Sequence, residues 1–205
     1  MKGFIVAGTD TYVGKTIFAA GLAQALRAHY WKPVQAGLDG ETDSEAVARL
    51  APDARVLPEA YRFRTPCSPH HAASVENTFV DMMQLRLPVV DGPLVVEGAG
   101  GVLVPYREDL LAADIFGIWE LPAILVARTA LGTISHTLLS LEAMRLRGVD
   151  VAGVAFIGEE EPVAERAIGR IGGAPMLGRL PMLDPLDAET LAAAFADNIR
   201  VDLLA

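Results

Sequence analysis

The chain has 205 residues, of which 52% are hydrophobic, and carries one cysteine and a formal net charge of −9. This length fits one domain spanning residues 1–205, and the acidic balance argues against a nucleic-acid partner, because that binding relies on Lys and Arg. The single cysteine, Cys67, excludes an internal disulfide and a multi-cysteine metal site.

Membrane and export signals are missing from the sequence pattern. No run of about 18 apolar residues could cross a bilayer, and the first ten residues, MKGFIVAGTD, are too short for a secretory signal. We therefore expect a cytoplasmic protein with no membrane partner.

The strongest local signal is the stretch Gly8 to Thr16, GTDTYVGKT, between an expected strand (Phe4 to Ala7) and an expected helix (Ile17 to Ala28, extending to about residue 29). A phosphate loop needs inward backbone N–H groups, a helix N-terminus, a Lys for the outer phosphates and a hydroxyl for Mg²⁺. The tripeptide Gly14 to Thr16 supplies the last two of these, the Lys and the hydroxyl. The strict motif would place its first Gly where this chain has Thr9, so the pattern predicts a variant loop; the alternative is a Gly-rich turn with a solvated Lys.

The next segment, Tyr30 to Val34, reads as a short apolar strand with Lys32 near its end. Because a proline follows Lys32, its backbone is expected to be extended rather than helical. Its side chain has two interpretations, a cation over the phosphate loop or an ordinary surface lysine, and local sequence alone favours the surface lysine.

A helix is predicted to begin at Thr42, with Asp43 in its acidic first turn. Asp43 is either a helix-capping carboxylate or an oxygen ligand for Mg²⁺, and the capping interpretation is favoured locally. Residues 52–74 are expected to be irregular, and the adjacent histidines within them lack partners at zinc spacing. Residues 79–87 have helical apolar spacing and are predicted to pack as core.

A second strong signal is the apolar run Leu94 to Glu97, followed by Gly98 to Gly101. A buried parallel strand that ends in a carboxylate and glycines is typical of the ligand edge of an α/β sheet. We expect Glu97 to belong to a magnesium shell, although an incidental carboxylate in a structural turn is possible.

The rest of the chain continues the alternation of strands and helices. The predicted strands are 124–127, 151–157 and 175–180, and the predicted helices are 133–147, with an anion-binding N-terminus, and 162–171. Together these segments predict an α/β fold of the P-loop NTPase type, with a doubly wound, mostly parallel sheet and helices on both faces.

Several motifs together closely resemble the dethiobiotin synthetase family. They are GTDTYVGKT, YWKPVQAG (30–37), TDSEAV (42–47), SPH (68–70), VEGAGG (96–101), LPAILVARTALGTISHTLLS (121–140) and LGRLP (177–181). Their order and separations match as well, so the resemblance covers nearly the whole chain. It implies an ATP-dependent cyclo-ligase of biotin biosynthesis that joins CO₂ to 7,8-diaminopelargonic acid and releases ADP and phosphate.

The resemblance also implies roles for individual residues. Lys15, Lys32 and Thr11 would be catalytic, and Thr16, Asp43 and Glu97 would bind Mg²⁺. The ATP co-substrate would be held by Asp10, Thr11, Tyr12, Val13, Gly14, Lys15, Thr16, Ile17 and Pro181. The substrate would be held by Thr11, Lys32 and Gly100, and, from the second subunit of a homodimer, by Gly132, Thr133, Ile134 and Ser135.

The chain also departs from the family pattern at positions that contact ligands. Tyr12 replaces an acidic or small residue, Ala36 replaces a hydroxyl residue, and Ile157 with Gly158 replaces an Asn that reads adenine. These departures leave the base preference open and shift the expected base contacts to residues 180–184. The main rival hypothesis is a switch-type P-loop ATPase or GTPase, although the chain lacks a guanine signature and a second Lys early in the loop.

Overall fold

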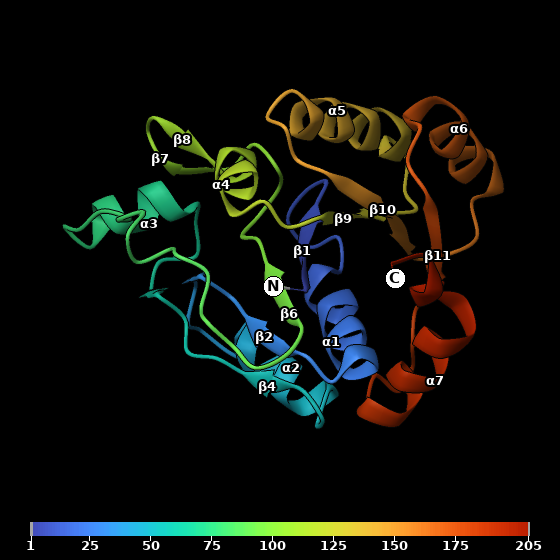
Figure 1. Ribbon diagram of the computed structural model, residues 1–205, viewed down its shortest axis with the longest axis horizontal. Helices are drawn as coiled ribbons and strands as arrows, with labels where there is room; N and C mark the ends of the chain where they lie inside the picture. Colours follow the sequence, from blue (N-terminus) through green and yellow to red (C-terminus); the bar gives the residue numbers. More distant parts are fainter. Residues whose placement is uncertain (1, 205) are drawn as a thin grey trace.

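The computed structural model describes residues 2–204 and is built around a seven-stranded sheet whose recorded strand pairs are all parallel (Figure 1). In spatial order the strands are β11 (Met176–Leu180), β10 (Val151–Ile157), β9 (Ala123–Arg128), β1 (Gly3–Gly8), β6 (Leu94–Glu97), β2 (His29–Trp31) and β4 (Arg55–Val56). Two small sheets pair β3 (Val34–Ala36) with β5 (Tyr61–Phe63) and β7 (Pro105–Arg107) with β8 (Leu110–Leu111).

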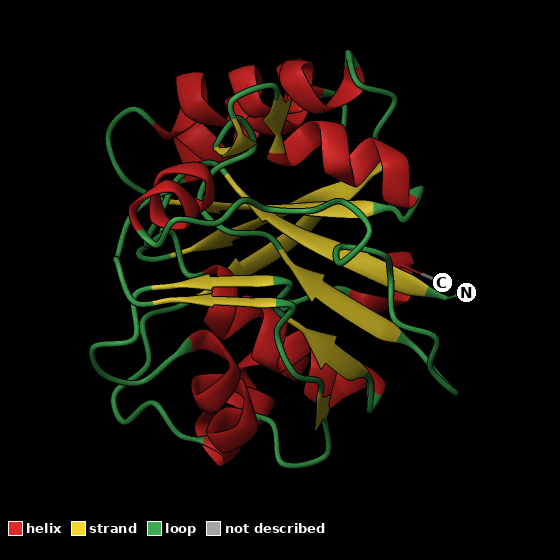
Figure 2. Ribbon diagram, turned by 90° about the vertical axis from the view of Figure 1, so that its left-hand side faces the viewer, coloured by secondary structure: helices red, strands yellow, loops and turns green. Residues whose placement is uncertain are grey.

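Helices cover both faces of the central sheet, so that Figure 2 shows the strands between two helical layers. One face carries α1 (Lys15–Leu26), α2 (Asp43–Leu50) and α7 (Ala188–Asn198). The other carries α3 (Pro69–Val75), α4 (Ala112–Trp119), α5 (Thr133–Arg145) and α6 (Pro162–Gly172), and a 3-10 helix (Val201–Leu204) follows α7. The predicted doubly wound α/β fold is therefore confirmed.

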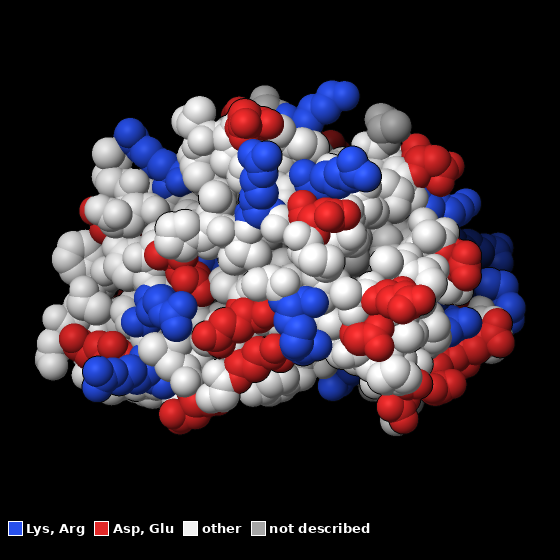
Figure 3. Space-filling view, turned by 90° about the horizontal axis from the view of Figure 1, so that it is seen from below, with Lys and Arg blue, Asp and Glu red and all other residues white. Residues whose placement is uncertain are grey.

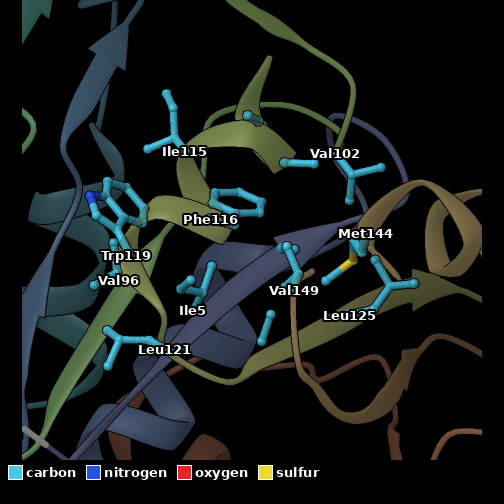
Figure 4. Close-up of a cluster of buried hydrophobic side chains, with 14 of the residues drawn as sticks. Ile5, Val96, Val102, Ile115, Phe116, Trp119, Leu121, Leu125, Met144 and Val149 are labelled. Atoms are coloured by element: carbon cyan, nitrogen blue, oxygen red, sulfur yellow. The ribbon is translucent and has the colours of Figure 1, made fainter. Parts of the chain in front are cut away.

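The two cores explain why the strands are continuous apolar runs. Successive residues of a strand point to opposite faces, so Ile5 of β1 packs on the α4–α5 side while its neighbour Val6 packs on the α1–α7 side. Figure 4 shows the first of these cores, in which strand residues lie beneath aromatic residues of α4. Its labelled members include Ile5, Val96, Leu125, Phe116, Trp119 and Met144.

Among the described residues, no helix has the length and apolarity needed to span a membrane. The strands predicted at residues 4–7, 94–97, 124–127, 151–157 and 175–180 correspond to β1, β6, β9, β10 and β11. The helix predicted to begin at Thr42 is α2, and Thr42 forms a reciprocal capping box with Glu45.

Two local predictions in the first part of the chain were wrong. The first helix ends at Leu26 rather than near residue 29, because Arg27 adopts a left-handed conformation with φ of 48° that closes the helix without a glycine. Residues 52–74 contain β4, β5 and most of α3, so this segment is not irregular throughout. The histidines follow Pro69, which occupies the first turn of α3.

Residues 79–87 form no helix. Asp81 makes two hydrogen bonds that do not belong to a helix. Its N–H donates to the hydroxyl of the distant Tyr61 at 2.8 Å, and its carboxylate accepts from the nearby Met83 N–H at 2.9 Å. Val80 and Leu85 are buried, whereas Phe79 is exposed. The apolar spacing therefore reflects a turn-rich segment that lies across the core.

Candidate active site

The loop between β1 and α1 has the form of a phosphate-binding loop. Gly14 caps α1 in a left-handed conformation with φ of 93°, and a Cβ there would lie 2.5 Å from Cδ1 of Ile157. Only glycine fits this backbone and this space. No side chain caps the helix, so its first N–H groups remain available to an anion.

Lys15 lies folded along this loop and is buried. Its Nζ donates to the carbonyl oxygen of Asp10 at 2.8 Å, and a Cβ on Gly8 would lie 2.9 Å from the same nitrogen. Burial, followed by the nearby Lys32 ammonium, lowers the pKa of Lys15 to about 8. A phosphate group would supply the negative charge that this buried cation lacks.

Glu97 ends β6 and is completely buried. Its Oε1 accepts from Lys32 Nζ and from the Thr16 hydroxyl, each at 2.9 Å, and its Oε2 accepts from the Tyr30 hydroxyl at 2.8 Å. These donors offset the cost of removing a carboxylate from water. β1 and β2 are the neighbours of β6 in the sheet. β1 leads into α1, which carries Thr16, whereas β2 carries Tyr30 and is followed by Lys32.

Lys32 follows β2 and is also buried, so the surface-lysine interpretation is wrong. Its Nζ donates to Asp43 Oδ2 at 2.6 Å, to Glu97 Oε1 at 2.9 Å and to the Gly98 carbonyl oxygen at 3.2 Å, which uses all three of its hydrogens. Burial acts to lower the pKa of Lys32, but the carboxylates of Glu97 and Asp43 outweigh it and raise the pKa above its ordinary value. Lys32 is therefore a permanent cation at this site.

Asp43 brings a second carboxylate to the same centre from the first turn of α2. Burial opposes its ionisation, yet the Lys32 ammonium and the Thr16 hydroxyl hold its pKa below the usual range. Its own N–H donates to the Gln35 side-chain oxygen at 3.3 Å. Asp43 thus lies in the first turn of a helix that Thr42 caps, while its carboxylate pairs with Lys32, and its role as a magnesium ligand stays a prediction.

The oxygens of Thr16, Asp43 and Glu97 converge in a manner that fits a hard divalent cation. The Thr16 hydroxyl lies 3.0 Å from Asp43 Oδ1 and 2.9 Å from Glu97 Oε1, but its single hydrogen can serve only one of them. Within residues 2–204 no group of three or more His, Cys, Asp and Glu side chains is arranged to hold a metal ion by itself. Two carboxylates and a hydroxyl suit Mg²⁺, which keeps several waters and is often shared with phosphates.

Other predicted nucleotide-binding residues lie along the loop. Asp10 accepts the Thr11 N–H on its carboxylate at 2.7 Å, and Thr11 is exposed. Tyr12 is 95% exposed and has a φ of 57°, which is uncommon for a residue with a side chain. Val13 is buried, whereas Ile17 is partly buried on α1.

The remaining predicted substrate residues are dispersed along the same edge of the sheet. Gly100 lies in the loop after β6, where Gly101 approaches the phosphate loop and a Cβ on it would lie 3.3 Å from the Thr9 carbonyl oxygen. Gly132 to Ser135 begin α5 beyond β9, on the other side of β1, and Pro181 follows β11. No hydrogen bond or ion pair within the described chain joins these residues to Lys32 or Glu97.

Tyr30 was missed by sequence reasoning although its hydroxyl contacts Glu97. A usable signal existed, because Tyr30 and Lys32 are two residues apart and extended backbone places such residues on the same side. Burial and the charge of Glu97 raise the pKa of Tyr30 well above its ordinary value, so the phenol keeps its proton and remains a donor.

Arg179 lies on β11, directly before residues 180–184, for which the sequence predicts base contacts. Its Nη1 donates to the Gly158 carbonyl oxygen at 3.1 Å, and its Nε lies 3.2 Å from Glu165 Oε1. The adjacent Ile157 touches the phosphate loop at Gly14, so this region offers an aliphatic side chain and a guanidinium rather than an amide.

Comparison with known proteins agrees with this geometry. The family described as AAA domain matches residues 2–190. A ParA family ATPase from Chlorobium tepidum TLS has a similar structure, with a TM-score of 0.51 and 12% identity over 100% of this chain and 92% of that one, which shows the fold alone. The fold and the phosphate loop thus define a P-loop protein of the AAA domain family.

Two similar curated proteins narrow this class. The ATP-dependent dethiobiotin synthetase BioD of Rhodopseudomonas palustris strain HaA2 is 57% identical over 203 residues, covering 98% of this chain and 95% of that protein. The protein of the same name from Agrobacterium fabrum strain C58 is 58% identical over 200 residues, covering 97% and 94%. The chain belongs to the ATP-dependent dethiobiotin synthetase family.

Proposed function

We propose that this protein uses ATP to join CO₂ to 7,8-diaminopelargonic acid, closing the ureido ring of dethiobiotin in biotin biosynthesis. The observation that carries the proposal is the cluster formed by the buried Lys32 and Glu97 with the partly buried Asp43 and Thr16 beside a phosphate loop. Full-length identity of 57% to a dethiobiotin synthetase supports the choice of reaction. A cytoplasmic location is in keeping with the use of ATP.

The reaction has three chemical stages in this proposal. One substrate amine adds to CO₂ and loses a proton to give a carbamate. A carbamate oxygen then takes the terminal phosphoryl group of ATP, releasing ADP. The second amine attacks the carbonyl carbon of this mixed anhydride, which expels phosphate and closes the ring. Phosphoryl transfer depends mainly on alignment and charge stabilisation, so no protein nucleophile is required.

The phosphate loop would bind and orient the triphosphate. Lys15 and the uncapped N–H groups of α1 offer positive charge and donors to phosphate oxygens. The other predicted loop residues, from Asp10 to Val13, would enclose the phosphates through their backbone. Residues 180–184 would contact the base.

Lys32 would hold the carbamate and stabilise the charge on the transferring group, with Thr11 as a neighbouring hydroxyl donor. This role is supported by the burial and the raised pKa of Lys32, which keep its charge fixed in a region of low dielectric. Because each of its hydrogens already has a partner, a ligand oxygen must replace one of these acceptors.

Thr16, Asp43 and Glu97 are the residues that would hold Mg²⁺. When bound, the metal supplies positive charge that offsets the charge of the ATP phosphates. The converging oxygens described above support this assignment.

The N-terminus of α5 would receive the substrate carboxylate from the partner subunit of a homodimer. Gly132 caps this helix in a left-handed conformation without a side-chain cap, and the buried Thr133 hydroxyl has no hydrogen-bond partner among the described residues. Both features favour an anion at the helix start. Leu131 beside them is fully exposed, which is in keeping with a subunit contact.

The proposal includes no nucleic-acid ligand, because a net charge of −9 opposes binding to a phosphate backbone. Figure 3 supports this on the face that it shows, where Lys and Arg alternate with Asp and Glu instead of forming one basic surface.

The decisive experiment measures ADP release with ATP, diaminopelargonate and bicarbonate, and then omits each of the last two in turn. We expect release to depend on both. Turnover that is indifferent to the diamine would contradict the ligase proposal and favour the switch-type ATPase.

A further inference from the structure

The peptide group that joins Gly98 to Ala99 is held by hydrogen bonds at both ends. Its carbonyl oxygen accepts from Lys32 Nζ at 3.2 Å, and its N–H donates to the Tyr106 hydroxyl at 2.9 Å. Lys32 is 3% exposed and Tyr106 is fully buried. One planar amide thus connects a buried ammonium with a buried phenol.

Tyr106 itself has a fixed position. It lies on β7, outside the central sheet, and its ring belongs to the same core as Phe116 and Trp119 of α4. The chain before β7 is tied to α4, because the N–H groups of Ala112 and Ala113 donate to the carbonyl oxygens of Val104 and Val102, each at 2.9 Å. The hydroxyl is therefore presented to Ala99 by a packed ring rather than by a mobile side chain.

The loop that Tyr106 anchors has few other hydrogen bonds near Ala99: the Gly98 N–H donates to the Val6 carbonyl oxygen at 3.1 Å and the Val104 N–H to the Gly101 carbonyl oxygen at 3.0 Å. Gly98, Gly100 and Gly101 surround Ala99, and glycines leave the backbone free to rotate. A peptide group is planar, so fixing the direction of its N–H also fixes the direction of its C=O. Together with the bond from the Gly98 N–H to Val6, the bond to Tyr106 fixes where the Gly98 carbonyl meets the Lys32 ammonium.

We propose that Tyr106 is a positioning residue that aligns the Lys32 ammonium through the Gly98–Ala99 peptide group. The proposal rests on the role proposed above for Lys32 in phosphoryl transfer. Without Tyr106 the Ala99 N–H loses its acceptor, the peptide group can rotate, and the ammonium is held only by Asp43 and Glu97.

The test compares Tyr106→Phe with Tyr61→Phe. The two phenols accept the same kind of bond, since the Tyr61 hydroxyl accepts from the Asp81 N–H at 2.8 Å, and Asp81 is not among the groups that bind the Lys32 ammonium. Each change keeps the aromatic ring and removes one acceptor of a backbone N–H. An effect on activity that comes from lost stability alone should therefore appear in both variants, whereas an effect that comes from misalignment of Lys32 should appear only in Tyr106→Phe.

We expect Tyr106→Phe to lower kcat for diamine-dependent ADP release about tenfold, with the KM for ATP unchanged. Amide hydrogen exchange of Ala99, followed by NMR, should become faster in the same variant. Tyr61→Phe should leave kcat and the exchange of Ala99 unchanged.

A double-mutant cycle then asks whether Tyr106 acts through Lys32. In a Lys32→Gln background, Tyr106→Phe should change kcat by less than about twofold, because the ammonium to be aligned is no longer there. A full tenfold loss in that background, or an unchanged kcat in Tyr106→Phe alone, would overturn the proposal. If Lys32→Gln itself retained full kcat, the role proposed for Lys32 would fail, which is a different result from failure at Tyr106.

Discussion

The buried carboxylate of Glu97 depends on each of its donors, because an ionised group cut off from water needs hydrogen bonds to both oxygens. Lys32 and Thr16 serve one oxygen, while Tyr30 serves the other. These donors come from two separate segments, the start of α1 and the stretch 30–32 at the end of β2, so the hydrogen bonds of Glu97 depend on how both segments pack against β6.

Tyr30→Phe should therefore destabilise the protein by about 1–3 kcal/mol, because Glu97 Oε2 then remains buried without its phenol donor. Denaturant unfolding monitored by circular dichroism measures this free energy. Tyr61→Phe is the matched control, and it should cost less, because the bond that it removes joins two neutral groups. A free energy of unfolding that Tyr30→Phe leaves unchanged would show that Glu97 gains nothing from the phenol.

Lys15 leads to a prediction about pH. Its pKa is lowered to about 8, so in the free protein it loses its proton as the pH rises through this value, whereas bound phosphates favour the charged form and raise the pKa. The affinity for ADP should thus fall as the pH increases from 8 towards 10. Lys32 should not contribute, since its pKa is raised and it stays charged over this range.

Isothermal titration of ADP at several pH values tests the Lys15 prediction, and proton uptake near pH 8 can be read from buffers that differ in ionisation enthalpy. Thermal unfolding of the free protein serves as a control for loss of fold at high pH. An affinity that is constant between pH 7 and 10 would mean that Lys15 does not titrate in this interval.

At the scale of elements, most of the central sheet was predictable, because buried parallel strands are continuous apolar runs with a distinct boundary. The phosphate loop and the end of β6 were also predictable, since their glycines mark special backbone. The first helix end and residues 79–87 were not, because Arg27 adopts a left-handed cap without a sequence signal and Asp81 directs a local turn.

The candidate site shows the same division. Lys15, Thr16, Asp43 and Glu97 have local motifs, whereas for Lys32 local sequence favoured a surface lysine and only the family resemblance favoured the site. Its burial between two carboxylates depends on segments 11 and 65 residues away, which no local pattern contains. Tertiary contacts of this kind explain why the surface-lysine interpretation was preferred from local sequence.

The capping box of α2 gives a prediction at this scale. Thr42 fixes the start of the helix that carries Asp43, so Thr42→Ala should cost about 1 kcal/mol of stability and raise the Mg²⁺ concentration needed for half-maximal turnover. Asp187→Ala removes a similar capping box from α7, and it should cost about the same stability without changing the Mg²⁺ requirement. Magnesium titrations of ADP release, paired with denaturant unfolding, separate the two effects; equal Mg²⁺ requirements in both variants would contradict the prediction.

At the scale of the whole molecule, strand order determines which groups meet. β1 lies in the middle of the sheet and ends at the phosphate loop; β6 and β2 on one side bring Glu97 and Lys32, and β9 on the other side leads into α5 (Figure 1). The carboxyl ends of parallel strands share one edge, where α/β proteins bind their ligands. The α5 start and Lys32 thus flank the loop of one chain, and a homodimer would bring the α5 start of one subunit to the Lys32 of the other.

The site that we propose the two subunits share predicts that two inactive variants restore each other. Lys32→Gln removes the cation proposed to be catalytic. Ser135→Asp places a carboxylate in the first turn of α5, where it suits the helix dipole but would repel the carboxylate of the proposed substrate. Each homodimer should have low kcat/KM for the diamine. A mixture that exchanges subunits should recover up to about a quarter of wild-type activity, because heterodimers contain one site with both residues intact and random pairing makes half of all dimers mixed. If the activity of the mixture equals the average of the two separate variants, Lys32 and the α5 start serve the site of the same chain. A Ser135→Ala variant mixed in the same way controls for the loss of the serine hydroxyl alone.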